Sequence, residues 1–188
     1  MPISLQTGKW TALVKVNNWI IVHHVAVMAH PGRHYFTAVD NYHKSKGWGM
    51  IGYQWFIERA PLNSQMEPKT LNEFIDCGII KKGRPDNMVG AHTRQQLMNY
   101  RSIGVCFAGN FDLQGLTHWQ VKAARLLFTY LQLKYGIRNG KIRPHSQFAT
   151  YKTCPGKEFK KIMRQIIGGR QIHKQLRYIP PEMDFIPS

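Results

Sequence analysis

The segment from Pro144 to Gly156, PHSQFATYKTCPG, brings three chemically active side chains close together in the sequence. The imidazole of His145 and the thiol of Cys154 are nine positions apart, and Lys152 lies two positions before the thiol. Neutral imidazole and thiolate are both good zinc ligands, and a catalytic zinc site has three protein ligands and one open position. The segment therefore offers two ligands, and a third must come from elsewhere in the chain.

Two adjacent histidines, His23 and His24, are candidates for the third ligand. They follow the apolar run WIIV, whose β-branched residues are typical of a buried central strand. Side chains alternate along a strand, so one histidine faces the core and the other faces the opposite side or a cleft. An imidazole at the carboxyl end of a strand can complete a site in such a cleft. These residues alone leave open which of the two does so.

The elements that must position these residues follow from hydrophobic periodicity and from helix signals. Thr117 and Gln120 form a capping-box pattern before an apolar face that ends at Gly136. Residues 60–73 are polar and contain two prolines, which predicts an inserted loop with at most a short helix. The other predicted elements are strands over 19–28, 52–58 and 102–109, a strand or hairpin over 74–82, and helices over 36–46 and from Gly156 to Gly168. This mixture predicts an α/β fold, with a central mixed β-sheet flanked by helices.

Composition indicates one globular domain with an unusual charge. The chain has 188 residues, of which 43% are hydrophobic, and its 26 lysines and arginines against 10 acidic residues give a net charge of +16. Such a charge attracts polyanions, which include nucleic acid, acidic lipid headgroups and anionic envelope polymers. Three cysteines are too few for a disulfide framework. The first residues, MPISLQTGKW, lack the pattern of a secretory signal, so we expect synthesis in the cytoplasm.

Five motifs in order match a known family. They are IIVHHVA, HKSKGWGMIGYQWFI, GRP followed by VGAHT, SIGVCFAGN, and the PHSQFATYKTCPG segment. With these motifs the chain resembles the type 2 N-acetylmuramoyl-L-alanine amidases, which include T7-lysozyme-like phage endolysins and peptidoglycan recognition proteins. The resemblance spans residues 19–159. We expect an amidase catalytic domain over 1–168 and a basic C-terminal tail at 169–188. Residues 60–73 are an insertion relative to the family, and the tail has no counterpart in it.

The resemblance also implies the roles of particular residues. The Zn²⁺ ligands would be His23, His145 and Cys154, in a cleft at the sheet edge, whereas the family does not use the position of His24. Tyr53 and Lys152 would be catalytic, and the residues along the substrate groove would be His92, Thr93 and Asn99. The implied reaction is hydrolysis of the amide bond between N-acetylmuramic acid and L-alanine by zinc-activated water, with Tyr53 and Lys152 stabilising the oxyanion.

The implied biology is that of a phage or prophage endolysin that degrades the bacterial cell wall. Its partner would be peptidoglycan, and its basic surface would add anionic wall polymers or outer-membrane lipid. We expect a monomer that acts on the wall or in the periplasm after release. We do not expect nucleic acid as a partner, because charge alone leaves the histidines and the cysteine unexplained.

Two other functions fit parts of the sequence. Cys154 precedes a predicted helix, whose dipole lowers the pKa of a thiol, so a cysteine peptidase with a histidine base is one alternative. Such an enzyme would not need His23 and would be insensitive to chelators. The second alternative is a recognition module of the same fold that binds peptidoglycan without cleaving it. Members of that kind lack the cysteine, so Cys154 favours catalysis.

Overall fold

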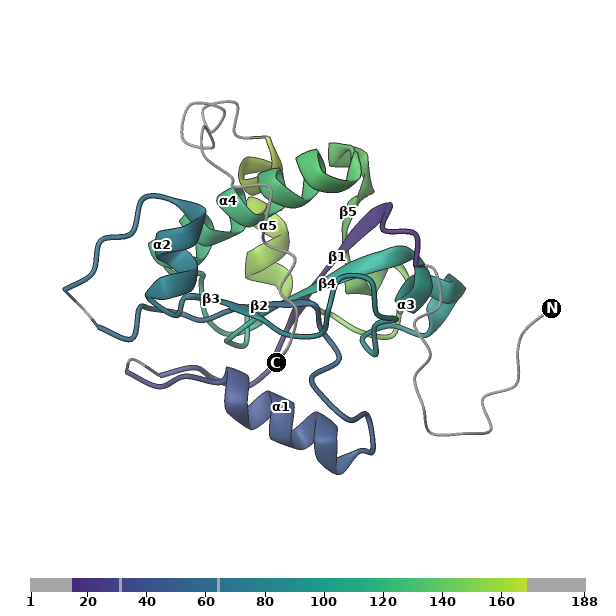
Figure 1. Cartoon of the computed structure of the whole chain (residues 1–188), viewed down its shortest axis with the longest axis horizontal. Coiled ribbons are helices and arrows are strands. Elements are labelled where there is room, and N and C mark those ends of the chain that lie inside the picture. Colours follow the sequence, from purple (N-terminus) through teal and green to yellow (C-terminus); the bar gives the residue numbers. More distant parts are fainter. Residues whose placement is uncertain (1–14, 31, 64, 169–188) are drawn as a thin grey trace.

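A five-stranded sheet with helices on both faces forms the framework of the protein (Figure 1). The computed structural model describes residues 15–30, 32–63 and 65–168. The strand order is β3-β2-β4-β1-β5; β2, β4, β1 and β5 run parallel, and β3 is antiparallel to β2. The strands are β1 (Trp19–His24), β2 (Trp55–Ile57), β3 (Ile80–Lys82), β4 (Ser102–Phe107) and β5 (Ile142–Pro144). The predicted fold class, a mixed sheet flanked by helices, is confirmed.

The helices divide between the two faces of this sheet. Figure 1 shows α1 on one side and α2, α4 and α5 on the other. Their bounds are α1 (Phe36–Ser45), α2 (Leu71–Asp76), α3 (Met98–Arg101), α4 (His118–Tyr135) and α5 (Lys157–Ile167). Short 3₁₀ turns occupy Gln95–Leu97, Asn139–Lys141 and His145–Gln147.

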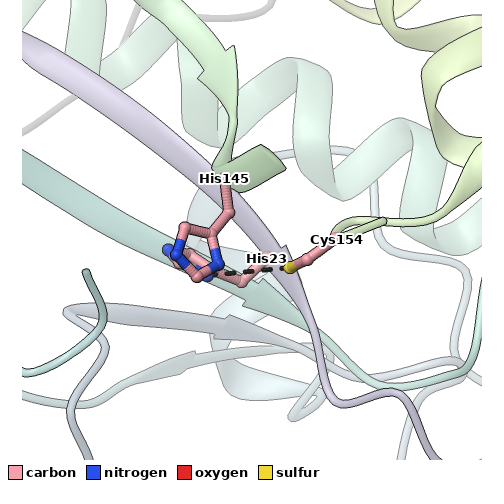
Figure 2. Close-up of side chains that lie close together, drawn as sticks. All are labelled: His23, His145 and Cys154. Carbon is pink, nitrogen blue, oxygen red and sulfur yellow. Dashed lines mark hydrogen bonds between the residues drawn. The ribbon is translucent and has the colours of Figure 1, made fainter. Parts of the chain in front are cut away.

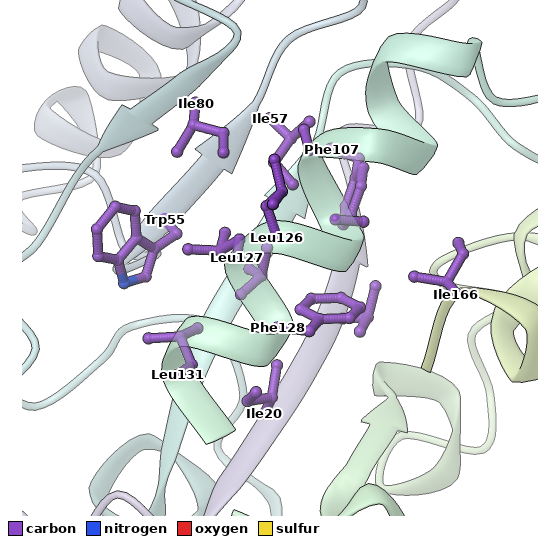
Figure 3. Packing of buried hydrophobic residues seen from close by; sticks show 14 of the residues in the cluster. Ile20, Trp55, Ile57, Ile80, Phe107, Leu126, Leu127, Phe128, Leu131 and Ile166 are labelled. Carbon is purple, nitrogen blue, oxygen red and sulfur yellow. The ribbon is translucent and has the colours of Figure 1, made fainter. Parts of the chain in front are cut away.

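The alternation of side chains along β1 connects the core to the site. Ile20 and Val22 are fully buried in the large cluster that packs beneath α4, which Figure 3 shows together with side chains of β2 and β4. Ile21 belongs to a different cluster on the opposite face. Because the period of a strand is two residues, His24 shares the face of Val22 and His23 shares the face of Ile21. The two histidines therefore point to opposite sides of the sheet.

The periodic helices match their predictions closely. In α4 the Thr117 hydroxyl accepts from the Gln120 backbone N–H and the Gln120 side chain accepts from the Thr117 N–H, both at 3.2 Å, and Gly136 ends the helix with φ +65°. In α5 the residues Phe159, Met163 and Ile166 are buried at the predicted helical spacing. The apolar face of each helix thus decides its packing.

The region between β2 and β3 differs from its prediction. A strand or hairpin over 74–82 is wrong in its first part, because Leu71–Asp76 is the helix α2. Thr70 caps this helix by accepting from the Glu73 N–H at 3.3 Å, a local signal that outweighs the apolar pair at 74–75. A strand forms only over Ile80–Lys82.

Other differences concern lengths and short elements. The strands at 19–28, 52–58 and 102–109 are shorter than predicted, and β5 and α3 were not predicted. The proposed basic tail, 169–188, lies outside the described residues. Within the described ranges, no helix is both long and apolar enough to cross a membrane.

Candidate metal centre

Three buried side chains meet at the carboxyl ends of β1 and β5. They belong to His23, His145 and Cys154, and their ligand atoms all lie within 4.8 Å of one another. The Cys154 Sγ is 3.8 Å from His23 Nδ1, the contact drawn as a dashed line in Figure 2. The two imidazole rings are 4.4 Å apart between centroids.

Strand pairing brings the two histidines to the same place. β1 and β5 are parallel neighbours, and Val22 lies opposite Pro144. The residues that follow this pair in the sequence are His23, after Val22, and His145, after Pro144. Because parallel strands end at the same edge of a sheet, both imidazoles emerge together. The fold thus places the side chain of His23, and not that of His24, beside His145.

A tight loop returns the thiol to this point. The Ser146 N–H donates to the Cys154 carbonyl at 2.8 Å, which closes the segment between them. Gly156 then has φ +97°, and any Cβ there would collide with the Phe111 backbone. Glycine at this position lets α5 begin directly after Cys154 while the loop packs against its neighbour.

His24 lies on the other face, as the alternation along β1 requires. Its Nδ1 accepts from the Phe111 N–H at 3.1 Å, and its ring stacks on the Phe111 ring. Its imidazole is therefore buried and hydrogen-bonded, and it is not part of the donor cluster found in the described part of the chain. His43 is likewise a buried, hydrogen-bonded histidine, which accepts from the Gly52 N–H at 3.0 Å.

Burial keeps both imidazoles of the cluster neutral. It lowers the pKa of His145 to about 4, with Lys152 and His24 adding to the fall. It also lowers the pKa of His23 well below its usual value, and His92 and His145 lower it further. Each neutral ring has a free lone pair at neutral pH, which is the form that binds a metal.

The thiol responds to burial in the opposite direction. Burial raises the pKa of Cys154 to about 12, although the charge of Lys152 opposes the rise. Without a bound cation the residue is a protonated thiol at neutral pH and a poor nucleophile. A protonated, buried thiol argues against the cysteine-peptidase alternative.

The donor set fits a zinc ion. Zinc takes imidazole nitrogen at about 2.0–2.1 Å and thiolate sulfur at about 2.3 Å in tetrahedral geometry, which separates ligand atoms by roughly 3.5 Å. The 3.8 Å between Cys154 Sγ and His23 Nδ1 is close to that separation. Two neutral nitrogens and one sulfur leave a fourth position open, which is the arrangement of catalytic zinc sites.

Tyr53 lies beside His23, and Lys152 lies at the rim of the groove. The Tyr53 ring is 5.1 Å from the His23 ring between centroids, just before β2. Burial raises the pKa of Tyr53 well above its usual value, and Cys106 and Cys154 add to the rise, so the phenol stays protonated. Lys152 is exposed at the rim of the site, and its charge lowers the pKa of all three donor residues.

A groove of about 570 Å³ opens beside the cluster. His145 and Lys152 line it, together with all three residues expected along a substrate groove, His92, Thr93 and Asn99. Asn99 Oδ1 accepts from the backbone N–H of His92 at 2.9 Å and of Thr93 at 2.8 Å, so its side chain fixes this wall of the groove. The His92 ring lies deeper, against His23.

Sequence reasoning missed several residues of the same groove. They are Trp48, Arg94, Gln95, Tyr100 and Tyr151. Gln95 Nε2 donates to the Tyr151 hydroxyl at 3.3 Å. The wall of the groove near His92 therefore contacts the ligand loop, by which we mean residues 145–154. The position of Tyr151, next to Lys152, was the only signal in the sequence for this contact.

Comparison with known proteins gives a consistent family. The family described as N-acetylmuramoyl-L-alanine amidase (Amidase_2) matches residues 14–157. Peptidoglycan-recognition protein SC2 of Drosophila melanogaster is 27% identical over 156 residues, covering 78% of this chain and 72% of that protein.

Solved structures extend the same likeness to the fold. The N-acetylmuramoyl-L-alanine amidase LysC from Clostridium intestinale superposes with a TM-score of 0.63 at 26% identity, over 82% of this chain and 87% of that chain. The Ph2119 endolysin of a Thermus scotoductus bacteriophage has a TM-score of 0.59 at 21% identity, over 81% and 86%. The second match bears on the fold alone.

Proposed function

The chain belongs to the N-acetylmuramoyl-L-alanine amidase family, and on this premise we propose that it cleaves peptidoglycan at the amide bond between N-acetylmuramic acid and L-alanine. The observation that carries the proposal is the convergence of His23, His145 and Cys154 beside a groove. The three residues would hold a zinc ion. When bound, such an ion supplies Lewis acidity toward the amide carbonyl and lowers the pKa of a water molecule toward neutrality.

Tyr53 is the proposed hydrogen-bond donor to the reacting carbonyl oxygen. Its protonated phenol is partly buried, and its ring packs against the His23 ring. A donor already held in place stabilises a developing oxyanion without reorganising. The environment of the ring thus supports a catalytic role rather than a purely packing one.

Lys152 is the proposed second electrostatic group. Its ammonium group carries a positive charge at the rim of the groove, close enough to affect the pKa of each donor residue. A cation there stabilises negative charge that develops on the substrate. Lys152 or Tyr53 would also provide the proton that the leaving amine requires.

The groove gives the proposed enzyme a place for a stem peptide. Thr93 and Asn99 line one wall, and His145 and Lys152 line the other parts near the cluster. The names of a similar amidase and of similar peptidoglycan-recognition proteins support peptidoglycan as the partner. We propose that the enzyme acts as a monomeric endolysin of phage or prophage origin, on the wall or in the periplasm.

The basic surface would add contacts to anionic wall polymers or outer-membrane lipid. Among the described residues, Arg143, Lys160 and Arg164 line a second groove of about 530 Å³ between β5 and α5. Cations on one surface attract polyanions, and salt screens that attraction. If wall binding does not weaken as salt rises from about 50 to 300 mM, or after Lys160→Gln with Arg164→Gln, this part of the proposal fails.

A recognition module that binds without cleaving is the second candidate. The similarity to peptidoglycan-recognition proteins supports it. The presence of a complete donor set, including Cys154, favours catalysis.

Analysis of the reaction products separates the two candidates. Purified peptidoglycan is incubated with the protein, and the soluble fraction is examined by mass spectrometry. The amidase proposal predicts free stem peptides that begin with L-alanine. Binding to the sediment without any released peptide would instead establish the recognition module, and cuts inside the stem peptide would exclude both.

A further inference from the structure

The two nitrogens of His23 face different partners. Its Nδ1 is 3.8 Å from Cys154 Sγ, within the donor cluster. Its Nε2 is 3.0 Å from Nδ1 of His92, whose ring lies nearly perpendicular at 5.0 Å between centroids. Both histidines are buried, and they are 69 positions apart in the sequence. The nitrogen of His23 that faces away from Cys154 is thus in contact with the imidazole of His92.

Backbone surrounds the ring of His92 and keeps it in place. A Cβ on Gly104 would lie 2.6 Å from His92 Cδ2, and a Cβ on Gly90 would lie 2.5 Å from the same atom. Side chains at these two positions would therefore displace the ring. The Asn99 carboxamide holds the His92 backbone from a third direction, at 2.9 Å. The ring thus occupies a space that exists because residues 90 and 104 are glycines without a Cβ.

We propose that His92 is a positioning residue, which holds the His23 ring with Nδ1 directed toward the metal. The orientation and tautomer of a metal-ligating histidine are set by the hydrogen bond of its other nitrogen. If Nδ1 of His23 provides the ligand lone pair, its Nε2 carries the proton and donates to His92 Nδ1. The inference rests on the proposed zinc function and assigns this residue a role in the same site.

This role differs from that of a ligand and from that of a substrate contact. His92 is not among the side chains whose donor atoms cluster within 4.8 Å in the described part of the chain. A residue that binds substrate affects KM and leaves metal affinity unchanged. A positioning residue changes metal affinity even when no substrate is present.

The test measures the zinc affinity of the full chain by competition with a chromophoric chelator, and the absorption spectrum of its cobalt form. Three variants are compared: His92→Leu, which removes the acceptor; His92→Gln, whose carboxamide oxygen can accept; and His118→Gln, an exposed histidine, as control. We expect His92→Leu to weaken zinc binding by about 10- to 100-fold and to shift the cobalt spectrum. His92→Gln should recover part of the loss, and the control should match the unaltered chain.

Gly104→Ala provides a second route that removes no polar atom. It should displace the His92 ring and also weaken zinc binding, even if His92→Leu does not fold. Zinc affinities of His92→Gln and Gly104→Ala that equal that of His118→Gln would overturn the inference, and so would a His92→Leu protein that binds zinc normally. If the unaltered chain binds no zinc, the proposed function fails first.

Discussion

At the scale of single residues, the site combines groups that burial has pushed in opposite directions. Burial keeps His23 and His145 neutral, while it keeps Cys154 protonated and the phenol of Tyr53 intact. A cation that enters would find two lone pairs ready and would have to displace one proton, from the thiol. The nearby charge of Lys152 favours the thiolate and thereby assists that displacement.

Tyr53→Phe tests the proposed donor. Loss of one preorganised donor to an oxyanion costs about 10²- to 10³-fold in kcat. We expect that loss with little change in KM and with unchanged zinc content, since the ring remains in place. The measurement is steady-state release of stem peptide, with Tyr42→Phe, an exposed tyrosine, as the matched control. A Tyr53→Phe protein with normal kcat would remove the residue from the mechanism.

The lowered pKa of His145 predicts that the folding stability of the metal-free chain depends on pH. Its pKa is about 4 when folded and near 6.5 when unfolded, so the unfolded state binds more protons between these values. Stability is therefore complete above about pH 6.5 and falls as the pH drops toward 4, by roughly 3 kcal/mol for a shift of this size. Urea unfolding at pH 7.0, 5.5 and 4.5 measures it. His145→Gln should show a shallower slope, and an equal slope would contradict the assignment.

Residue chemistry was the part of the site most accessible from the sequence. Zinc-ligand residue types and the family motifs singled out His23, His145 and Cys154, and the fold brings these residues together. The contact of His92 with His23 was out of reach, because it joins residues 69 positions apart through a slot made by glycines. Nothing in the local sequence around His92 encodes that neighbour.

At the scale of elements, the site depends on where β1 and β5 end and on how α5 begins. β1 is a continuous apolar run, and α4 and α5 carry strong periodic patterns, so the positions of all three could be predicted. β5 has only three residues, including Arg143 and Pro144, and it exists because it pairs with β1. Such pairing between distant segments leaves no periodic signal. The edge strand that carries His145 into the site was therefore missed.

Gly156→Ala tests the junction between the ligand loop and α5. The residue has φ +97°, and a Cβ would meet the Phe111 backbone, so the loop or the helix must move. We expect a loss of about 1–3 kcal/mol in stability and weaker zinc binding, because Cys154 is only two positions away. Gly140→Ala, where a Cβ meets nothing within 4 Å, is the control. Chemical unfolding and zinc titration of both variants measure these effects. A Gly156→Ala protein with the stability and zinc affinity of Gly140→Ala would contradict the prediction.

At the scale of the whole molecule, the sheet separates packing from chemistry. One face buries its large apolar cluster beneath α2, α4 and α5, and the donor side chain of β1 points to the other face. The groove opens beside the donor cluster, and its walls come from the segments that follow α1, β3 and β5 rather than from the core. Family membership fixes this architecture, whereas catalysis depends on whether the buried donors hold a metal.

The most direct test combines zinc analysis with peptide release from peptidoglycan, for the unaltered chain and for Cys154→Ser. We predict about one zinc per chain and release of stem peptides that begin with L-alanine. Both should be lost on chelation and restored by added zinc, and Cys154→Ser should retain little of either. Stem peptides released by metal-free Cys154→Ser at the rate of the unaltered chain would contradict the account.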